Sequence, residues 1–145
     1  MKIPCELIVW HALPMIRREL AVELVGSHGM SQADVARKFG MSDAAVSQYI
    51  GKKRGTRPEF DPEDPAGIIF MEAIRESARR IAEENADPSV EMCKLCGTFR
   101  KTGLLDREFL AQTGSPPPKC SCYPGTDQRT GRSFRGMATD AKLRR

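Results

Sequence analysis

The chain has 145 residues, and its 23 lysines and arginines against 19 aspartates and glutamates give a formal net charge of +4. This length suits one compact domain, or a small domain with an appendage, and no apolar stretch is long enough to cross a membrane. The apolar start over residues 1–14 is short and contains Glu6 and His11, so it does not fit a secretion signal and we expect a cytoplasmic protein.

Two segments with apolar faces are expected before residue 26. Residues 1–12 are predicted to be helical or extended, with four side chains in the core: Ile3, Leu7, Ile8 and Trp10. Pro14 can open a helix that runs to about Val25. Its apolar stripe repeats every four residues, at Ile16, Leu20 and Leu24. Its solvent side is predicted to carry the charged residues Arg17, Arg18, Glu19 and Glu23.

Residues 31–55 predict two short helices joined by a tight turn. Ser31 and Ser42 can each cap a helix, and Gly40 stands where a left-handed residue is wanted after the first one. The inward faces are predicted to carry Val35, Ala36 and Phe39 in the first helix, and Val46 with Tyr49 or Ile50 in the second. This combination is typical of a helix-turn-helix. Because two such short helices cannot bury enough surface alone, flanking helices must complete the core.

A charged, proline-rich stretch separates this unit from a long helix. Residues 58–64 are predicted to be a linker, and Asp64 with Pro65 can open a helix over 65–86. One stripe of that helix is apolar and includes Ile69 or Phe70, Ile74, Ala78, and Ile81 or Ala82. The stripe is expected to pack either on the helix-turn-helix or on a second copy of itself. Because of the second alternative, this helix is the candidate dimer element.

The chain contains five cysteines. Inside a cell, cysteines are more often metal ligands, redox groups or small buried residues than structural disulfides. Cys93 and Cys96 form a CxxC pair, and Cys120 and Cys122 form a CxC pair; together they can supply four thiolates to one zinc ion or one iron–sulfur cluster. The spacing alone does not separate zinc from a cluster. Cys5 is either a small buried residue or a further ligand that makes one later cysteine dispensable.

The segment 31–55 resembles the helix-turn-helix of the Cro/C1-repressor (XRE) family. That family has a Gln at the start of its first helix, then an Ala, a turn Gly and a β-branched residue at fixed distances. This chain has Gln32, Ala36, Gly40 and Val46 in those places. The resemblance implies a lambda-repressor-like domain that binds double-stranded DNA, usually as a homodimer.

The resemblance also implies which residues meet DNA, because the second helix of such proteins enters the major groove. The implied base-contacting residues are Ser42, Asp43, Ala44, Ser47 and Gln48. Gln48 can bond an adenine edge and Ala44 can meet a thymine methyl, whereas Asp43 repels phosphate but can accept from a cytosine amino group. Phosphate contacts are implied for Gln32, Lys52, Lys53 and Arg54.

A wider resemblance covers most of residues 1–105. The segments PCE at 4–6, LPMIRREL at 13–20 and SQYIGKKRG at 47–55, with a downstream CxxC, are similar to a group of archaeal XRE-type regulators. This chain departs from that pattern by one additional lysine, Lys52 or Lys53. The resemblance implies a transcription regulator whose cysteines hold an iron–sulfur cluster and sense the redox state.

The chain is therefore expected to be an all-α DNA-binding transcription regulator in five parts. These are a helix-turn-helix domain over 1–57, the linker over 58–64, the long helix over 65–86, a cysteine-rich segment over 87–125 and a flexible basic tail over 126–145. The alternative is a nucleic-acid-binding adaptor whose zinc is purely structural, which predicts a colourless protein whose DNA binding ignores oxidants. No nucleophile elbow or phosphate-binding glycine loop accompanies the thiols, so no enzymatic activity is expected.

Overall fold

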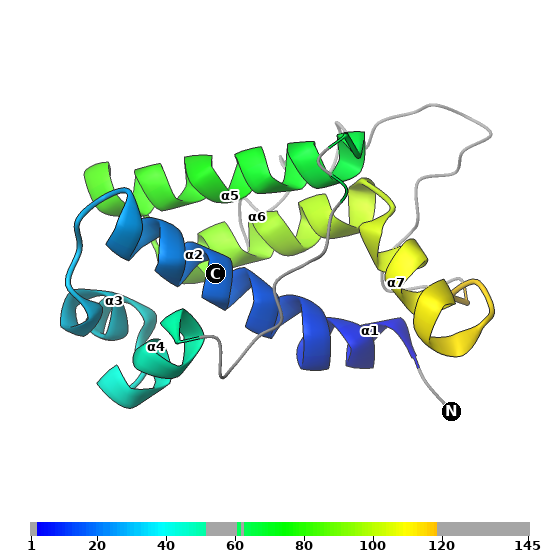
Figure 1. Ribbon diagram of the computed structural model, residues 1–145, viewed down its shortest axis with the longest axis horizontal. Helices are drawn as coiled ribbons and strands as arrows, with labels where there is room; N and C mark the ends of the chain where they lie inside the picture. The colour runs from blue at the N-terminus through cyan, green and yellow to red at the C-terminus, as the bar shows by residue number, and fades with distance from the viewer. Residues whose placement is uncertain (1–2, 52–60, 62, 119–145) are drawn as a thin grey trace, which may run out of the picture.

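Helices that are far apart in the sequence pack side by side around helix α2, Leu13–Gly26 (Figure 1). The computed structural model describes residues 3–51, 61 and 63–118, and all regular structure within these ranges is helical, which confirms the all-α class. None of the described helices is both long and apolar enough to cross a membrane. In chain order the elements are α1 (Pro4–Leu7), the π-helix η1 (Ile8–Ala12), α2 (Leu13–Gly26), α3 (Gln32–Phe39), α4 (Asp43–Ile50), α5 (Pro65–Glu83), α6 (Pro88–Lys101) and α7 (Leu104–Thr113).

Helix α2 is the central element of the fold. It packs against η1, α3, α4, α5 and α6, so it has neighbours on several sides. Figure 1 shows it running between α3 and α4 on one side and α5 and α6 on the other. Its predicted stripe is fully buried and consists of Ile16, Leu20 and Leu24. The short helices α3 and α4 thereby gain the extra apolar surface that they cannot provide alone.

The long helix α5 begins where its cap predicts. The side chain of Asp64 accepts a hydrogen bond from the backbone N–H of Ala66 at 3.3 Å, and Pro65 occupies the first helical position. The predicted stripe is buried, with Phe70, Ile74, Ala78 and Ile81 in the core. It packs against α2 and α6 of the same chain.

Helices α6 and α7 extend the same core into the cysteine-rich part of the chain. The side chain of Asp87 caps α6 by accepting a hydrogen bond from the backbone N–H of Ser89 at 2.8 Å. Phe99 of α6 meets Phe70 of α5 edge to face, with ring centroids 5.4 Å apart. Further core residues of these two helices are Leu95, Leu104, Leu105 and Phe109. The CxxC pair therefore stands on a helix that is anchored in the core.

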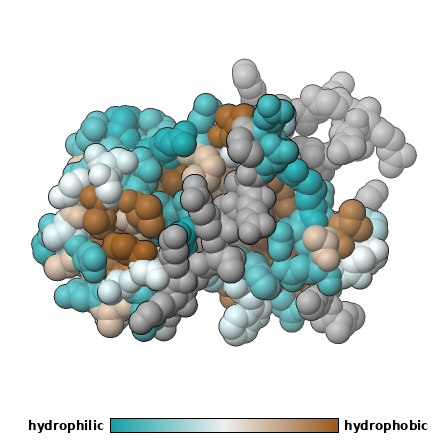
Figure 2. All heavy atoms as spheres, viewed as in Figure 1, coloured by the Kyte–Doolittle hydropathy of each residue, from teal (hydrophilic) through white to brown (hydrophobic). Residues whose placement is uncertain are grey.

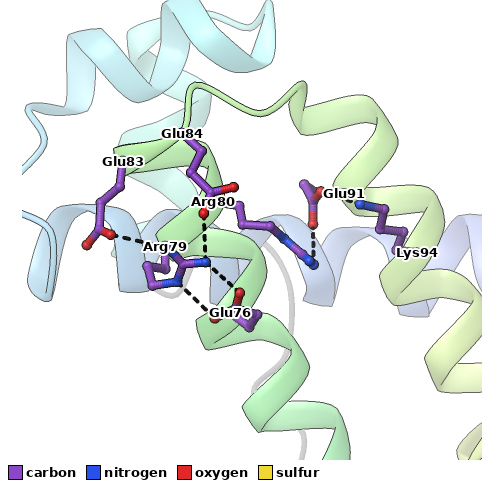
Figure 3. Close-up of polar contacts among 7 residues, drawn as sticks. All are labelled: Glu76, Arg79, Arg80, Glu83, Glu84, Glu91 and Lys94. Atoms are coloured by element: carbon purple, nitrogen blue, oxygen red, sulfur yellow. Dashed lines mark hydrogen bonds and ion pairs between the residues drawn. The ribbon is translucent and has the colours of Figure 1, made fainter.

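A buried carboxylate joins α5 to α6 (Figure 3). The Glu91 side chain is only 2% exposed, and its two oxygens lie 3.0 Å from the guanidinium of Arg80 and 2.8 Å from the ammonium of Lys94. Burial alone would raise the pKa of Glu91, but hydrogen bonds from Lys94 and Ser77 and the charge of Arg80 together hold that pKa below its usual range. A separate surface network in Figure 3 connects Arg79 to Glu76, Glu83 and Glu84.

The prediction that Trp10 and Ile3 are core residues is wrong. Trp10 is 74% exposed and Ile3 is also exposed, whereas Leu7 and Ile8 are buried as predicted. Ile3 precedes the first turn of α1, and for Trp10 the cause is the π-helical turn, in which the N–H of Leu13 donates to the carbonyl of Ile8. The wider turn changes which side chains face inward, so a period of 3.6 residues does not apply there.

The prediction that Arg18 and Glu19 face solvent is also wrong. Arg18 is 5% exposed and Glu19 is 8% exposed, and their side chains form an ion pair with each other. A single apolar stripe predicts a helix with one buried face, but α2 is surrounded by neighbours. Its charged side chains are therefore covered as well, and pairing reduces the cost of taking both charges out of water.

Candidate functional site

The first helix of the candidate DNA-binding unit, α3, is held by caps at both ends. The hydroxyl oxygen of Ser31 accepts a hydrogen bond from the backbone N–H of Asp34 at 3.1 Å. Gly40 ends the helix in the left-handed region with φ of 62°, and the N–H of Met41 donates to the carbonyl of Ala36 at 3.0 Å. This is the hydrogen-bond pattern of a glycine-terminated helix. The turn therefore has a fixed geometry that directs the chain into α4.

Helix α4 has a buried face and a polar face. Its cap is Ser42, whose hydroxyl oxygen accepts from the backbone N–H of Ala45 at 3.2 Å. Val46 and Tyr49 are buried, and the helix packs against α2 and α3. Of the predicted base-contacting residues, Ser42, Asp43, Ala44 and Ser47 are exposed and Gln48 is half-buried. The fold thus leaves these side chains accessible to a partner.

The predicted phosphate-contacting residues are described only in part. Gln32 begins α3 and is exposed. Lys52, Lys53 and Arg54 lie outside the described residues, as do most of the expected linker over 58–64 and all of the expected tail over 126–145. The backbone reaches Gly51 at the end of α4, so the basic run follows that helix directly in the chain.

Charged side chains of α3 contribute contacts that the sequence analysis did not single out. Arg37 pairs with Asp34 at 2.6 Å, and the Lys38 ammonium donates to the side-chain oxygen of Asn85 at 2.6 Å. The hydrogen bond with Ser31, followed by the charge of Arg37, lowers the pKa of Asp34. The signal for Asp34 was present in the sequence, because an acidic residue three positions after a capping Ser is typical of a helix start.

The cysteines of the described part fall on two elements. Cys93 is exposed and Cys96 is half-buried, one helical turn apart on α6, and Cys5 is half-buried in α1. Arg100 lies one turn after Cys96 on the same helix. Burial alone would lower the pKa of Arg100, but the interactions with the sulfurs of Cys96 and Cys5 outweigh it and raise the pKa.

The predicted metal site lies half inside and half outside the described residues. Cys93 and Cys96 are one turn apart on one helix, so they fit as two thiolate ligands of zinc or of an iron–sulfur cluster. Cys120 and Cys122 lie outside the described residues. Among the side chains that the structure describes, no three His, Cys, Asp or Glu residues are grouped closely enough to hold a metal ion. The described residues thus include two of the four predicted ligands, Cys93 and Cys96.

Comparison of the chain with protein-family models, with curated protein sequences and with solved structures finds no match.

Proposed function

We propose that this chain is a sequence-specific DNA-binding transcription regulator that uses α3 and α4 as a helix-turn-helix. The observation that carries the proposal is the polar, accessible face of α4 on a helix whose other face is buried against α2 and α3. A helix anchored in this way can enter a major groove as a rigid element. The net charge of +4 and the basic run after α4 add electrostatic attraction to phosphate.

Within this proposal, each exposed side chain of α4 has its own role in recognising DNA. Gln48 pairs with an adenine edge through its amide, and Ser47 donates to or accepts from a neighbouring base. Ala44 provides an apolar contact for a thymine methyl group, and Asp43 accepts from a cytosine amino group. Gln32 at the N-terminus of α3 is placed for a phosphate oxygen, which sets the position on the duplex but not the sequence preference.

The test starts from selection of bound duplexes out of a random-sequence pool, followed by affinity measurements on the enriched site. Gln48→Ala is expected to weaken binding to that site by about 1–3 kcal/mol, which is roughly 5- to 150-fold, and to relax the preference at one base pair. Gln112→Ala is the matched control, because Gln112 is also half-exposed but lies on α7, far from α3 and α4 in Figure 1. No enriched sequence, or equal losses for the two variants, would overturn the proposal.

We also propose that the cysteines of α6 and of the C-terminal part connect this regulator to a metal. The support is the thiol chemistry of Cys93 and Cys96, whose one-turn separation suits two ligands of zinc or of an iron–sulfur cluster. Anaerobic purification followed by metal and sulfide analysis distinguishes the alternatives. Iron with acid-labile sulfide supports a redox-responsive regulator, zinc supports the structural alternative, and the absence of both from freshly purified protein would overturn the metal proposal.

A further inference from the structure

The net positive charge of the chain lies in one segment. Residues 126–145 contain six basic and two acidic side chains, so they carry the whole formal charge of +4, whereas residues 1–125 contain 17 of each sign. We call residues 126–145 the basic segment; it lies outside the described residues. Its basic side chains are Arg129, Arg132, Arg135, Lys142, Arg144 and Arg145.

The described part of the fold is negatively charged. It contains 11 lysines and arginines against 16 aspartates and glutamates. On the surface of α5, a single arginine, Arg79, is shared by three exposed glutamates, Glu76, Glu83 and Glu84 (Figure 3). The phosphates of a duplex are repelled by an excess of carboxylates. The net charge of the described fold therefore does not attract DNA.

The proposed recognition unit has no excess of positive charge either. Residues 31–51 contain two basic and two acidic side chains, and both basic ones already have partners within the protein. Arg37 pairs with Asp34 at 2.6 Å. The ammonium of Lys38 donates to the side-chain oxygen of Asn85 at 2.6 Å. This unit can select a sequence through base contacts, but the sequence-independent attraction to phosphate has to come from another part of the chain.

We propose that the basic segment is a second DNA-binding element, which binds phosphate groups without reading bases. The inference rests on the proposed DNA-binding function and identifies the source of most of its electrostatic affinity. The basic run at residues 52–54 does not suffice for this, because residues 1–125, which include it, carry no net charge. The two elements thus divide the work: α4 selects the sequence, and the basic segment holds the chain on the duplex.

The basic segment is long enough to reach DNA that is bound by α4. The last described residue is Pro118, which follows α7, and α7 lies far from α3 and α4 in Figure 1. Residues 119–145 number 27, and a chain of that length spans at most about 90 Å. A domain of about 100 residues has a radius of gyration of only about 13 Å. Duplex on the exposed side chains of α4 is therefore within reach from the α7 side of the fold.

The acidic surface of the fold itself is the competing site for the same segment. If the basic segment bound the glutamates around Arg79, it would be withheld from DNA, and removing its charge would strengthen DNA binding. DNA is the better match, because a duplex carries one negative charge per about 1.7 Å of its axis. The three glutamates, in contrast, are already partly neutralised by their arginine. The two sites predict opposite changes in affinity, so one measurement separates them.

The test changes the charge of the basic segment in the full chain. The neutral variant combines Arg129→Gln, Arg132→Gln, Arg135→Gln, Lys142→Gln, Arg144→Gln and Arg145→Gln. The matched control replaces the five arginines by lysine and so keeps the charge. A third variant combines Asp127→Asn with Asp140→Asn and raises the formal net charge from +4 to +6. Affinities for the enriched duplex and for random-sequence duplex are measured at several salt concentrations, and circular dichroism checks that helicity is retained.

The expected result is a change in the salt dependence of binding. Each phosphate that a protein neutralises contributes about 0.9 to the slope of log affinity against log salt concentration. If the segment neutralises as many phosphates as its net charge, the slope of the neutral variant should be shallower by about 3 to 4. The advantage of the original chain should then shrink about 100-fold between about 50 and 200 mM salt. The lysine control should keep the original slope, and the asparagine variant should bind more tightly at low salt.

Three outcomes would overturn the proposal. One is an unchanged slope in a neutral variant that retains its helicity. Another is tighter DNA binding by that variant, which would place the basic segment on the acidic surface of the fold. The third is an equal change of slope in the lysine control, which would show that charge is not the cause. Failure of the recognition role is a separate result: if no sequence is enriched but random-sequence duplex shows the expected change of slope, the role of α4 fails and the basic segment remains a DNA-binding element.

Discussion

Glu91 provides the sharpest test of how α6 is attached to the rest of the fold. Its side chain is 2% exposed and pairs with Arg80 and Lys94, whereas Arg80 is 31% exposed and Lys94 is 53% exposed. Glu91→Gln keeps the size of the side chain but removes the charge that both cations face. Hydrogen bonds to a charged group contribute about 1.5–3 kcal/mol, and breaking a fully buried pair costs about 3–5 kcal/mol. Because water recovers part of the loss at Arg80 and Lys94, we expect a cost of about 2 kcal/mol.

The assay is urea unfolding at pH 7, with Glu76→Gln as the matched control. Glu76 also pairs with an arginine, at 2.7 Å, but it is exposed and Arg79 keeps Glu83 and Glu84 as partners. We expect Glu76→Gln to lower the free energy of unfolding much less than Glu91→Gln, because water and salt screen an exposed ion pair. A typical dependence of about 1–3 kcal/mol per molar urea turns the Glu91→Gln loss into a midpoint roughly 1 M lower. Equal losses in the two variants would refute the argument from burial.

The pH dependence gives an independent check on the same carboxylate. The folded pKa of Glu91 lies below its ordinary value of 4.5, so the unfolded chain takes up the proton first as the pH falls. The stability contributed by Glu91 is thus fully present above pH 4.5 and is lost as the pH falls through the folded pKa. The free energy of unfolding of the original chain should therefore approach that of Glu91→Gln at acidic pH. If the difference in the free energy of unfolding between the two proteins stays constant down to the pH of acid unfolding, the charge of Glu91 does not cause that difference.

Five further substitutions test the core, the turn and a helix cap. Phe70→Ala, at a fully buried position, should lower the free energy of unfolding by about 3–5 kcal/mol. Ile69→Ala, on the exposed side of α5, should lower it by less than about 1 kcal/mol. Equal losses in urea unfolding would contradict the packing of α5. Gly40→Ala should cost about 1 kcal/mol through the φ of 62° alone, because nothing lies within 4 Å of an added Cβ; an unchanged thermal midpoint would contradict this. Ser42→Ala should lose about 1 kcal/mol of cap stabilisation and Ser47→Ala less than about 0.5 kcal/mol, and the reverse order would contradict the capping role.

Local features of this chain were predictable because their causes are local. Ser31 and Ser42 cap helices, and Gly40 adopts a left-handed conformation, because each acts on backbone atoms a few residues away. The stripe of α5 was predictable for the same reason, since a period of 3.6 residues identifies one buried face. The exposure of the α4 residues followed from that reasoning, because a helix with one buried face presents the other to solvent.

Features that depend on several neighbours were not predictable in this way. Arg18 and Glu19 are covered because α2 has helices around it, which no single periodicity expresses. Trp10 is exposed because a π-helical turn interrupts the pattern.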